Sequence, residues 1–90
     1  MRSRYAAFVL ENAAYLRATW NASTRPVRID FAPGQEWLSL RVVAAHTAGN
    51  TATVEFVARS RIGGDTRVLH EVSRFVRDDG RWFYIDGDVK

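Results

Sequence analysis

Residues Thr53–Lys90 have the sequence TVEFVARSRIGGDTRVLHEVSRFVRDDGRWFYIDGDVK. Of all parts of the chain, they give the clearest indication of its fold. Runs in which apolar and charged residues alternate are separated by two turn sequences, Gly63-Gly64-Asp65 and Asp78-Asp79-Gly80. Alternation with a period of two is typical of strands with two unlike faces, and short glycine-containing turns join antiparallel neighbours. The stretch therefore predicts two consecutive β-hairpins.

Upstream of the hairpins, the pattern changes from strand to helix. Apolar residues from Arg2 to Trp20 recur about every 3.6 positions, the period of an amphipathic helix. Asn12 interrupts them and can cap a second segment, so we predict two helices, Ser3–Leu10 and Ala13–Trp20. The spacer that follows, residues 21–35, contains both prolines and is loop-like, with a short extended piece at Val27–Phe31.

The complete pattern predicts an α+β fold, with N-terminal helices packed on one face of a curved antiparallel sheet. Ninety residues are enough for one small domain, which we expect to span residues 1–90. The turn between the first two strands falls at residues 47–50. The four predicted strands are Glu36–His46, Thr51–Ile62, Thr66–Arg77 and Arg81–Asp86.

The two turns also predict which side chains share a face. A type I turn with left-handed Gly80 pairs Arg77 with Arg81, and a four-residue loop at Gly63-Gly64 places Glu55 opposite Arg74. Other loop lengths lose that charge pair. In this register, one face, the floor under the helices, carries Val54, Phe56, Ala58, Ser60, Leu69, Glu71, Ser73, Phe75, Phe83 and Ile85. The opposite face carries Glu55, Val57, Arg59, His70, Val72, Arg74, Trp82, Tyr84 and Asp86. In the first strand, Leu38, Leu40, Val42 and Ala44 share one face and Trp37, Ser39, Arg41 and Val43 the other.

Two features of this sheet are candidate catalytic sites. Glu71 places a carboxylate on the apolar face, where it is either a desolvated general base or the ion-pair partner of Arg4 or Arg17. His70 lies diagonal to Asp86, which permits a histidine–carboxylate dyad without an identifiable third group. Glu55–Arg74 is interpreted as a structural cross-strand ion pair. The outer-face aromatics with Val57, Val72 and Val76 form an apolar patch that a homodimer would bury.

Composition excludes several kinds of protein. With no cysteine, the chain has no disulfide, cysteine-ligated zinc or thiol nucleophile, and we expect no cofactor and no metal. The net charge of +3 comes from 12 arginines and one lysine, spread along the chain without the run that marks a nucleic-acid footprint. Because Glu11 ends the apolar stretch Ala6–Leu10 too early for a signal peptide or membrane span, we interpret the chain as cytoplasmic.

Several tracts together resemble the YchJ-like family of bacterial proteins. They are Arg2-Ser3-Arg4-Tyr5-Ala6-Ala7-Phe8, Tyr15-Leu16, Ala18-Thr19-Trp20, Ser23-Thr24-Arg25-Pro26, Val54-Glu55-Phe56, His70-Glu71-Val72-Ser73-Arg74-Phe75 and Gly80-Arg81-Trp82-Phe83-Tyr84-Ile85-Asp86-Gly87. The resemblance covers nearly the whole chain and implies a cone-shaped fold of the nuclear transport factor 2-like superfamily, with helices in the concave face of the sheet.

The resemblance implies where a binding site lies, but it implies no particular reaction. It places a pocket between helices and sheet, lined by Tyr5, Tyr15, Trp20, Arg25, Trp37, Glu71 and Ser73. Many family members carry cysteine-rich SEC-C zinc motifs, and without cysteines neither zinc nor SEC-C contacts carry over to this chain. Asn21-Ala22 stands where the family often has His-Pro, which weakens any ligand role there.

The leading functional hypothesis is a small binding or accessory module with a small-molecule ligand in that pocket. The alternative is a small enzyme of the isomerase or hydrolase type that uses Glu71 as general base, with Tyr15 or Arg25 orienting a polar substrate. Weak association with nucleic acid through the arginines is a third hypothesis, which their scattered positions disfavour. The leading hypothesis includes a homodimer through the outer sheet face.

Overall fold

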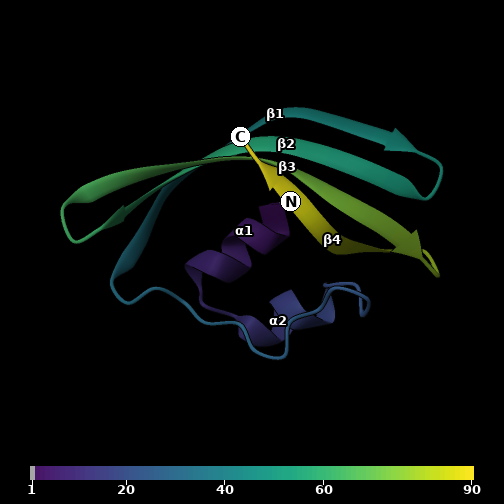
Figure 1. Cartoon of the computed structure of the whole chain (residues 1–90), viewed down its shortest axis with the longest axis horizontal. Coiled ribbons are helices and arrows are strands. Elements are labelled where there is room, and N and C mark those ends of the chain that lie inside the picture. Colours follow the sequence, from purple (N-terminus) through teal and green to yellow (C-terminus); the bar gives the residue numbers. More distant parts are fainter. Residues whose placement is uncertain (1) are drawn as a thin grey trace.

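The computed structural model describes residues 2–90 and contains two helices followed by four strands. The helices are α1 (Arg2–Val9) and α2 (Ala13–Ala18). The strands are β1 (Gln35–Ala48), β2 (Thr51–Ile62), β3 (Asp65–Asp78) and β4 (Arg81–Val89), and they form one antiparallel sheet in the order β1-β2-β3-β4. Figure 1 shows the sheet arching over both helices. The predicted α+β class and the helices on the concave side are confirmed.

The break between the helices lies where the sequence predicted it. Asn12 is the N-cap of α2, and its side-chain oxygen accepts a hydrogen bond from the Tyr15 amide at 3.1 Å. Glu11 takes a left-handed conformation, φ 52°, which turns the chain between the two helices. Because the cap satisfies one of the free amides at the helix start, a six-residue helix can begin here.

The segment after α2 is tied to the edge of the sheet. The Asn21 amide donates to the Tyr84 carbonyl at 2.7 Å, and the Tyr84 amide donates to the Thr19 carbonyl at 2.8 Å. Thr24 adds a hydroxyl hydrogen bond to the Ile85 carbonyl at 2.6 Å. These bonds cover the β4 edge. The extended piece predicted at Val27–Phe31 forms no strand.

All three hairpins have two-residue turns, and this corrects the predicted register. Asp79 (φ 51°) and Gly80 (φ 76°) are both left-handed, so Asp78 pairs with Arg81 where we predicted Arg77 with Arg81. Two consecutive left-handed residues are typical of a two-residue type I′ turn, whose twist matches that of the flanking strands. Gly63-Gly64 likewise pairs Ile62 with Asp65.

The shorter Gly63-Gly64 turn removes the predicted Glu55–Arg74 pair. Glu55 stands opposite Val72, and Arg74 stands opposite Thr53. The shift is two residues, so the side chains of β2 and β3 keep their predicted faces.

On β4 the shift is one residue, and it exchanges the faces. Tyr84 pairs with Phe75, and Trp82 with Arg77, so both aromatic rings lie on the concave face where we predicted the outer one. Phe83 pairs with Val76 and lies on the outer face, contrary to prediction. A bulge between the Tyr84–Phe75 pair and the Asp86–Arg74 pair restores the predicted outward position of Asp86. The homodimer through the outer face stays a prediction, now without its two aromatic residues.

Two bulges in β1 likewise change its faces. Trp37 pairs with Ser60 and Leu40 with Ala58, with a register shift between them, so both side chains lie on the concave face. A second shift follows Val42. The predicted strict alternation from Trp37 to Ala44 is therefore wrong. Each bulge inserts one extra residue into β1, so the side chains that follow it change face.

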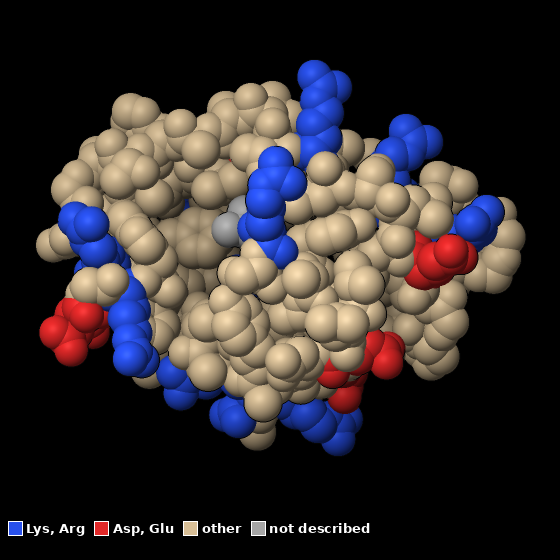
Figure 2. All heavy atoms as spheres, turned by 180° about the vertical axis from the view of Figure 1, so that it is seen from behind, with Lys and Arg blue, Asp and Glu red and all other residues tan. Residues whose placement is uncertain are grey.

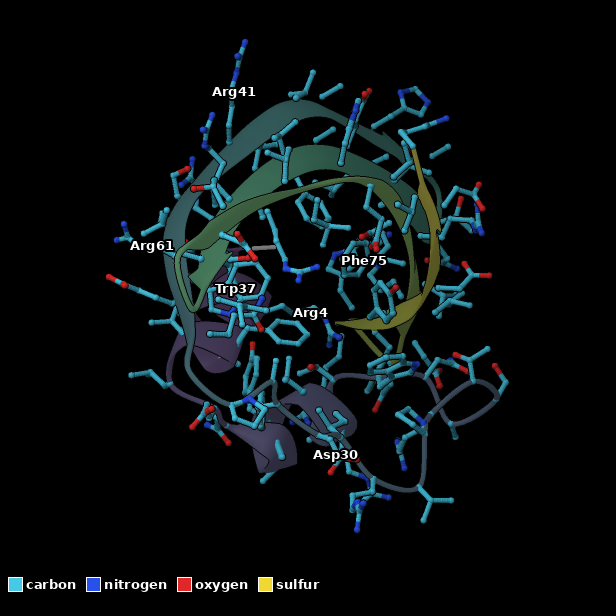
Figure 3. All side chains as sticks on the ribbon, turned by 60° about the vertical axis from the view of Figure 1, so that its left-hand side comes forward. Arg4, Asp30, Trp37, Arg41, Arg61 and Phe75 are labelled. Carbon is cyan, nitrogen blue, oxygen red and sulfur yellow. The ribbon has the colours of Figure 1, made fainter. Side chains whose placement is uncertain are left out.

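The core lies between the helices and the middle of the sheet. Its most buried side chains are Arg4, Ala7, Leu16, Phe56, Ala58, Ser60, Ser73 and Phe75. Figure 3 shows Arg4, Trp37 and Phe75 pointing into this space, whereas Arg41 and Arg61 point away from it. Within residues 2–90, neither helix has the length and apolar character needed to cross a membrane.

Candidate functional site

A cavity of about 160 Å³ lies between α1, the end of α2 and the concave face of the sheet. We call it the aromatic cavity, because six of its lining residues among residues 2–90 carry aromatic rings. They are Tyr5, Phe8, Trp20, Trp37, Phe56 and Tyr84. The rest of the described lining consists of Arg4, Leu40, Ala58, Leu69, Glu71 and Ser73. Tyr5 and Trp37 meet edge to face, with ring centroids 5.8 Å apart, which closes the β1 side.

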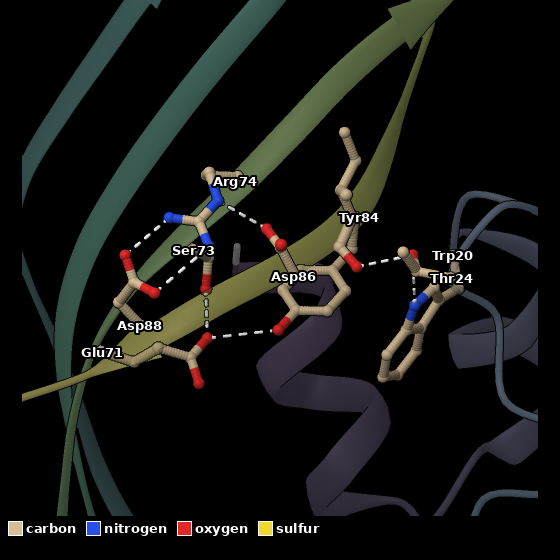
Figure 4. A network of polar contacts seen from close by, with 9 residues as sticks. Trp20, Thr24, Glu71, Ser73, Arg74, Tyr84, Asp86 and Asp88 are labelled. Carbon is tan, nitrogen blue, oxygen red and sulfur yellow. Dashed lines mark hydrogen bonds and ion pairs between the residues drawn. The ribbon is translucent and has the colours of Figure 1, made fainter.

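Glu71 is the carboxylate of the aromatic cavity. The hydroxyl of the fully buried Ser73 donates to its Oε2 at 2.5 Å, and the Tyr84 hydroxyl makes a longer contact of 3.5 Å with the same oxygen (Figure 4). Among residues 2–90, no arginine forms an ion pair with Glu71. The carboxylate is thus held by hydroxyls and adjoins open space, so it can accept a hydrogen bond from a ligand.

Arg4 lies at the centre of the concave face. Its guanidinium carbon is 4.5 Å from the centroid of the Tyr84 ring and 5.2 Å from that of Trp20. Nη1 donates to the Thr19 hydroxyl at 2.9 Å and to the Leu16 carbonyl at 3.4 Å. Burial lowers the pKa of Arg4, and the surrounding Tyr84, Tyr15 and Glu71 oppose that shift.

Tyr84 connects Arg4 and Glu71. Its ring packs at 4.8 Å, centroid to centroid, against Trp20, and its hydroxyl faces Glu71. Burial raises the pKa of Tyr84 to about 12, and the negative charge of Glu71 adds to the shift, while Arg4 opposes it. The phenol is therefore a neutral hydrogen-bond donor at any physiological pH.

A second, larger cavity of about 370 Å³ lies on the other side of Arg4. We call it the hydroxyl cavity, since Ser3, Tyr15, Thr19 and Thr47 contribute hydroxyls to its wall. Its remaining lining residues are Arg4, Ala52, Val54, Phe75 and Trp82. Among residues 2–90, Arg4 alone lines both cavities.

The outer face carries ion pairs in place of the predicted dyad. His70 Nε2 lies 2.6 Å from Glu55 Oε2, so its carboxylate neighbour is Glu55 where we predicted Asp86. Arg74 binds Asp86 at 2.6 Å and Asp88 at 2.6 Å (Figure 4). The Arg74 hydrogen bond lowers the pKa of Asp88. No cavity described above reaches this layer, which we interpret as structural.

The predicted pocket residues fall into three groups in the structure. Five line the aromatic cavity: Tyr5, Trp20, Trp37, Glu71 and Ser73. Tyr15 lines the hydroxyl cavity, where its hydroxyl donates to Ser3 at 2.8 Å. Arg25 lines neither cavity and donates to the Trp20 carbonyl at 3.0 Å. Arg17 does not reach Glu71 either, and its Nε donates to the Pro26 carbonyl at 3.4 Å.

Sequence reasoning missed Arg4 and Tyr84 as lining residues. Arg4 shares a helical face with Ala7 and Phe8, three and four positions later, and that spacing was a usable signal. Tyr84 was missed because the β4 register was one residue out. On the face shown in Figure 2, the Lys and Arg side chains stand at several separate places.

Comparison with protein families gives a match over residues 1–87 to the model YchJ_M-like, described as the YchJ middle NTF2-like domain. A UPF0225 protein of Polaromonas naphthalenivorans is 60% identical over 89 residues, which are 98% of this chain and 65% of that protein. A UPF0225 protein of Bordetella pertussis is 49% identical over 100% of this chain and 69% of its own length. The chain thus spans about two thirds of these relatives.

A solved structure shows the same fold. It is the solution structure of a SEC-C motif containing protein from Rhodopseudomonas palustris, with a TM-score of 0.89 and 35% sequence identity. The alignment covers 100% of this chain and 75% of that one. The arched sheet over two short helices is therefore found in an experimentally determined relative.

Proposed function

Since the chain belongs to the YchJ_M-like family of middle NTF2-like domains, we propose that it is a binding module whose ligand occupies the aromatic cavity. The observation that carries the proposal is a cavity of about 160 Å³ that six aromatic residues and one carboxylate among residues 2–90 line. Apolar cavities of about 150 Å³ hold molecules the size of benzene. The family fixes the fold, and the ligand is argued from the cavity alone.

The lining defines the chemistry of the ligand. Aromatic and aliphatic walls favour a small ring, and Glu71 Oε2 is an acceptor next to the open space. A ligand that carries one hydroxyl or amine donor satisfies this acceptor, whereas a pure hydrocarbon leaves it facing an apolar surface. We therefore expect the cavity to prefer small aromatic molecules with a single donor.

The test uses p-cresol as the probe and toluene as its counterpart without a hydroxyl. Binding is followed through the tryptophan indole signals in ¹H–¹⁵N spectra, because Trp20 and Trp37 line the aromatic cavity and Trp82 does not. We expect saturable shifts of the Trp20 and Trp37 signals, with p-cresol binding several-fold more tightly than toluene. A response confined to Trp82, or no saturable response, contradicts the proposal.

A pair of matched variants tests the location. Ala58, 2% exposed, lines the aromatic cavity, so Ala58→Leu fills it and should weaken p-cresol binding at least ten-fold. Ala45 is on the same face of the sheet, opposite Val54, but is exposed and lines neither cavity. Ala45→Leu should leave p-cresol affinity unchanged. Equal affinities in the two variants would place the probe elsewhere.

A second candidate function is catalysis by Glu71 as general base. Its support is that Glu71 adjoins a cavity and has no arginine ion pair among residues 2–90. Against it, the Ser73 and Tyr84 hydroxyls already contact Glu71 Oε2, and no other aspartate or glutamate among residues 2–90 lines the cavity. The test measures the exchange of cyclohexanone α-hydrogens for deuterium in D₂O. Exchange that the parent protein accelerates and Glu71→Gln does not would favour the enzyme. Exchange at the rate of buffer alone would exclude ketones of this class as substrates.

A further inference from the structure

Arg4 is a buried cation without a carboxylate partner. Its exposed fraction is 5%, and among residues 2–90 no aspartate or glutamate forms an ion pair with it. Removing a guanidinium from water is costly unless another charge or a full set of hydrogen bonds compensates. The stacked Tyr84 and Trp20 rings offset part of this cost, but neither supplies a negative charge.

The hydrogen-bond donors of Arg4 are only partly used. Nη1 has its two protein acceptors, whereas Nε and Nη2 have none among the described residues. Every side-chain nitrogen or oxygen that is sealed from solvent within residues 2–90 has a hydrogen-bond partner. The Nε and Nη2 atoms are therefore in contact with open space, and the open spaces that Arg4 lines are the two cavities.

The two cavities differ in charge. The aromatic cavity contains Glu71, which repels an anion, whereas none of the described residues that line the hydroxyl cavity is acidic. Ser3, Tyr15 and Thr19 supply hydroxyls on the helix side of the hydroxyl cavity. Its sheet side is mainly apolar, formed by Ala52, Val54, Phe75 and Trp82. The hydroxyl cavity is therefore an amphipathic space with a positive charge at its wall.

We propose that the hydroxyl cavity binds the carboxylate of a small organic acid, with Arg4 as counter-ion and the apolar part of the acid against Phe75 and Trp82. A guanidinium presents parallel N–H donors that match the two oxygens of a carboxylate. The volume of about 370 Å³ accommodates a ring and its acid group. This site goes beyond the proposed function, because it does not depend on any ligand in the aromatic cavity.

The first experiment compares phenylacetate with phenylacetamide, which has nearly the same shape and no charge. Trp82 lines the hydroxyl cavity and not the aromatic cavity, so its indole signal reports this site. We expect phenylacetate to shift the Trp82 signal saturably and to bind at least ten-fold more tightly than the amide. Equal affinity, a response limited to Trp20 and Trp37, or no binding of phenylacetate overturns the proposal.

Two arginine variants provide a matched pair. Arg4→Met removes the buried charge and should abolish the preference for the acid over the amide. Arg77 also stacks on an aromatic ring, 5.1 Å from the Trp82 centroid, but is exposed and lines neither cavity. Arg77→Met should keep the preference. If the preference survives in Arg4→Met, or disappears equally in both variants, Arg4 is not the counter-ion.

A third variant leaves Arg4 in place and so covers the case in which Arg4→Met does not fold. Ser3 is exposed to solvent on α1 and lines the hydroxyl cavity. Ser3→Asp brings a carboxylate of the chain into that cavity, where it competes for Arg4. We expect at least ten-fold weaker phenylacetate binding with unchanged p-cresol binding in the aromatic cavity. Undiminished phenylacetate affinity in Ser3→Asp contradicts the proposal.

Discussion

Gly87 lets Glu71 occupy its position beneath the sheet. A Cβ atom built on Gly87 would lie 2.6 Å from Cδ of Glu71 and closer still to its Oε2. Gly87 pairs with Ser73, the residue whose hydroxyl binds Glu71. Its φ angle is not in the left-handed region, so the glycine is explained by space and not by backbone conformation.

We predict that Gly87→Ala destabilises the fold through Glu71. The added methyl group forces the carboxylate away from Ser73, which costs about 2 kcal/mol for a hydrogen bond to a charged group. In a Glu71→Ala background the same substitution meets no carboxylate and should cost nothing. Urea unfolding of the four proteins measures this coupling as a double-mutant cycle. The same cost in both backgrounds would show that Glu71 is not the obstacle.

At the residue scale, the sequence predicted which side chains of β3 face inward but not what they meet. Glu71 and Ser73 lie on the concave face as predicted, because the two-residue shift of the β2–β3 register preserves parity. The partner of Glu71 was not predictable from spacing. Arg4 was an expected ion-pair partner, yet its guanidinium packs against both Trp20 and Tyr84, an arrangement that depends on the chain after α2 meeting β4.

At the scale of elements, the N-cap of α2 carries a prediction. The six-residue α2 is too short to be stable by itself, and its first amides depend on Asn12. Asn12→Ala should lower the free energy of unfolding by about 1 kcal/mol, whereas Asn12→Asp, which keeps an acceptor, should stay close to the parent chain. Urea unfolding followed by circular dichroism checks this. Equal losses in both variants would mean that Asn12 acts other than as a cap.

The positions of elements were predicted well, and the pairing between them less well. Periodicity and the Asn12 cap located both helices, and glycine-containing turns located all four strands. Turn geometry depends on the φ angles of individual residues, and left-handed Asp79 was not evident from the sequence. That one residue moved Tyr84 and Trp82 from the predicted outer face to the concave face. The bulges of β1 moved Trp37 for a similar reason.

At the scale of the whole molecule, the order of elements and the family resemblance together predicted the fold, and the family is confirmed by the match over residues 1–87. The cavities were not predictable in the same way. Their walls combine helix and sheet residues that are far apart in sequence, and their volumes depend on how the sheet curves over the helices (Figure 3). The pocket position implied by the resemblance is therefore kept here as a proposal.

The proposed ligand site lies beneath the sheet, in the aromatic cavity. An isotope-filtered NOE spectrum of labelled protein saturated with unlabelled p-cresol detects the bound probe directly. We expect contacts from the probe ring to the side chains of Leu40, Leu69 and Trp37, which line the aromatic cavity. Contacts to Val57 and Val72, which lie on the outer face of the sheet, would contradict this expectation.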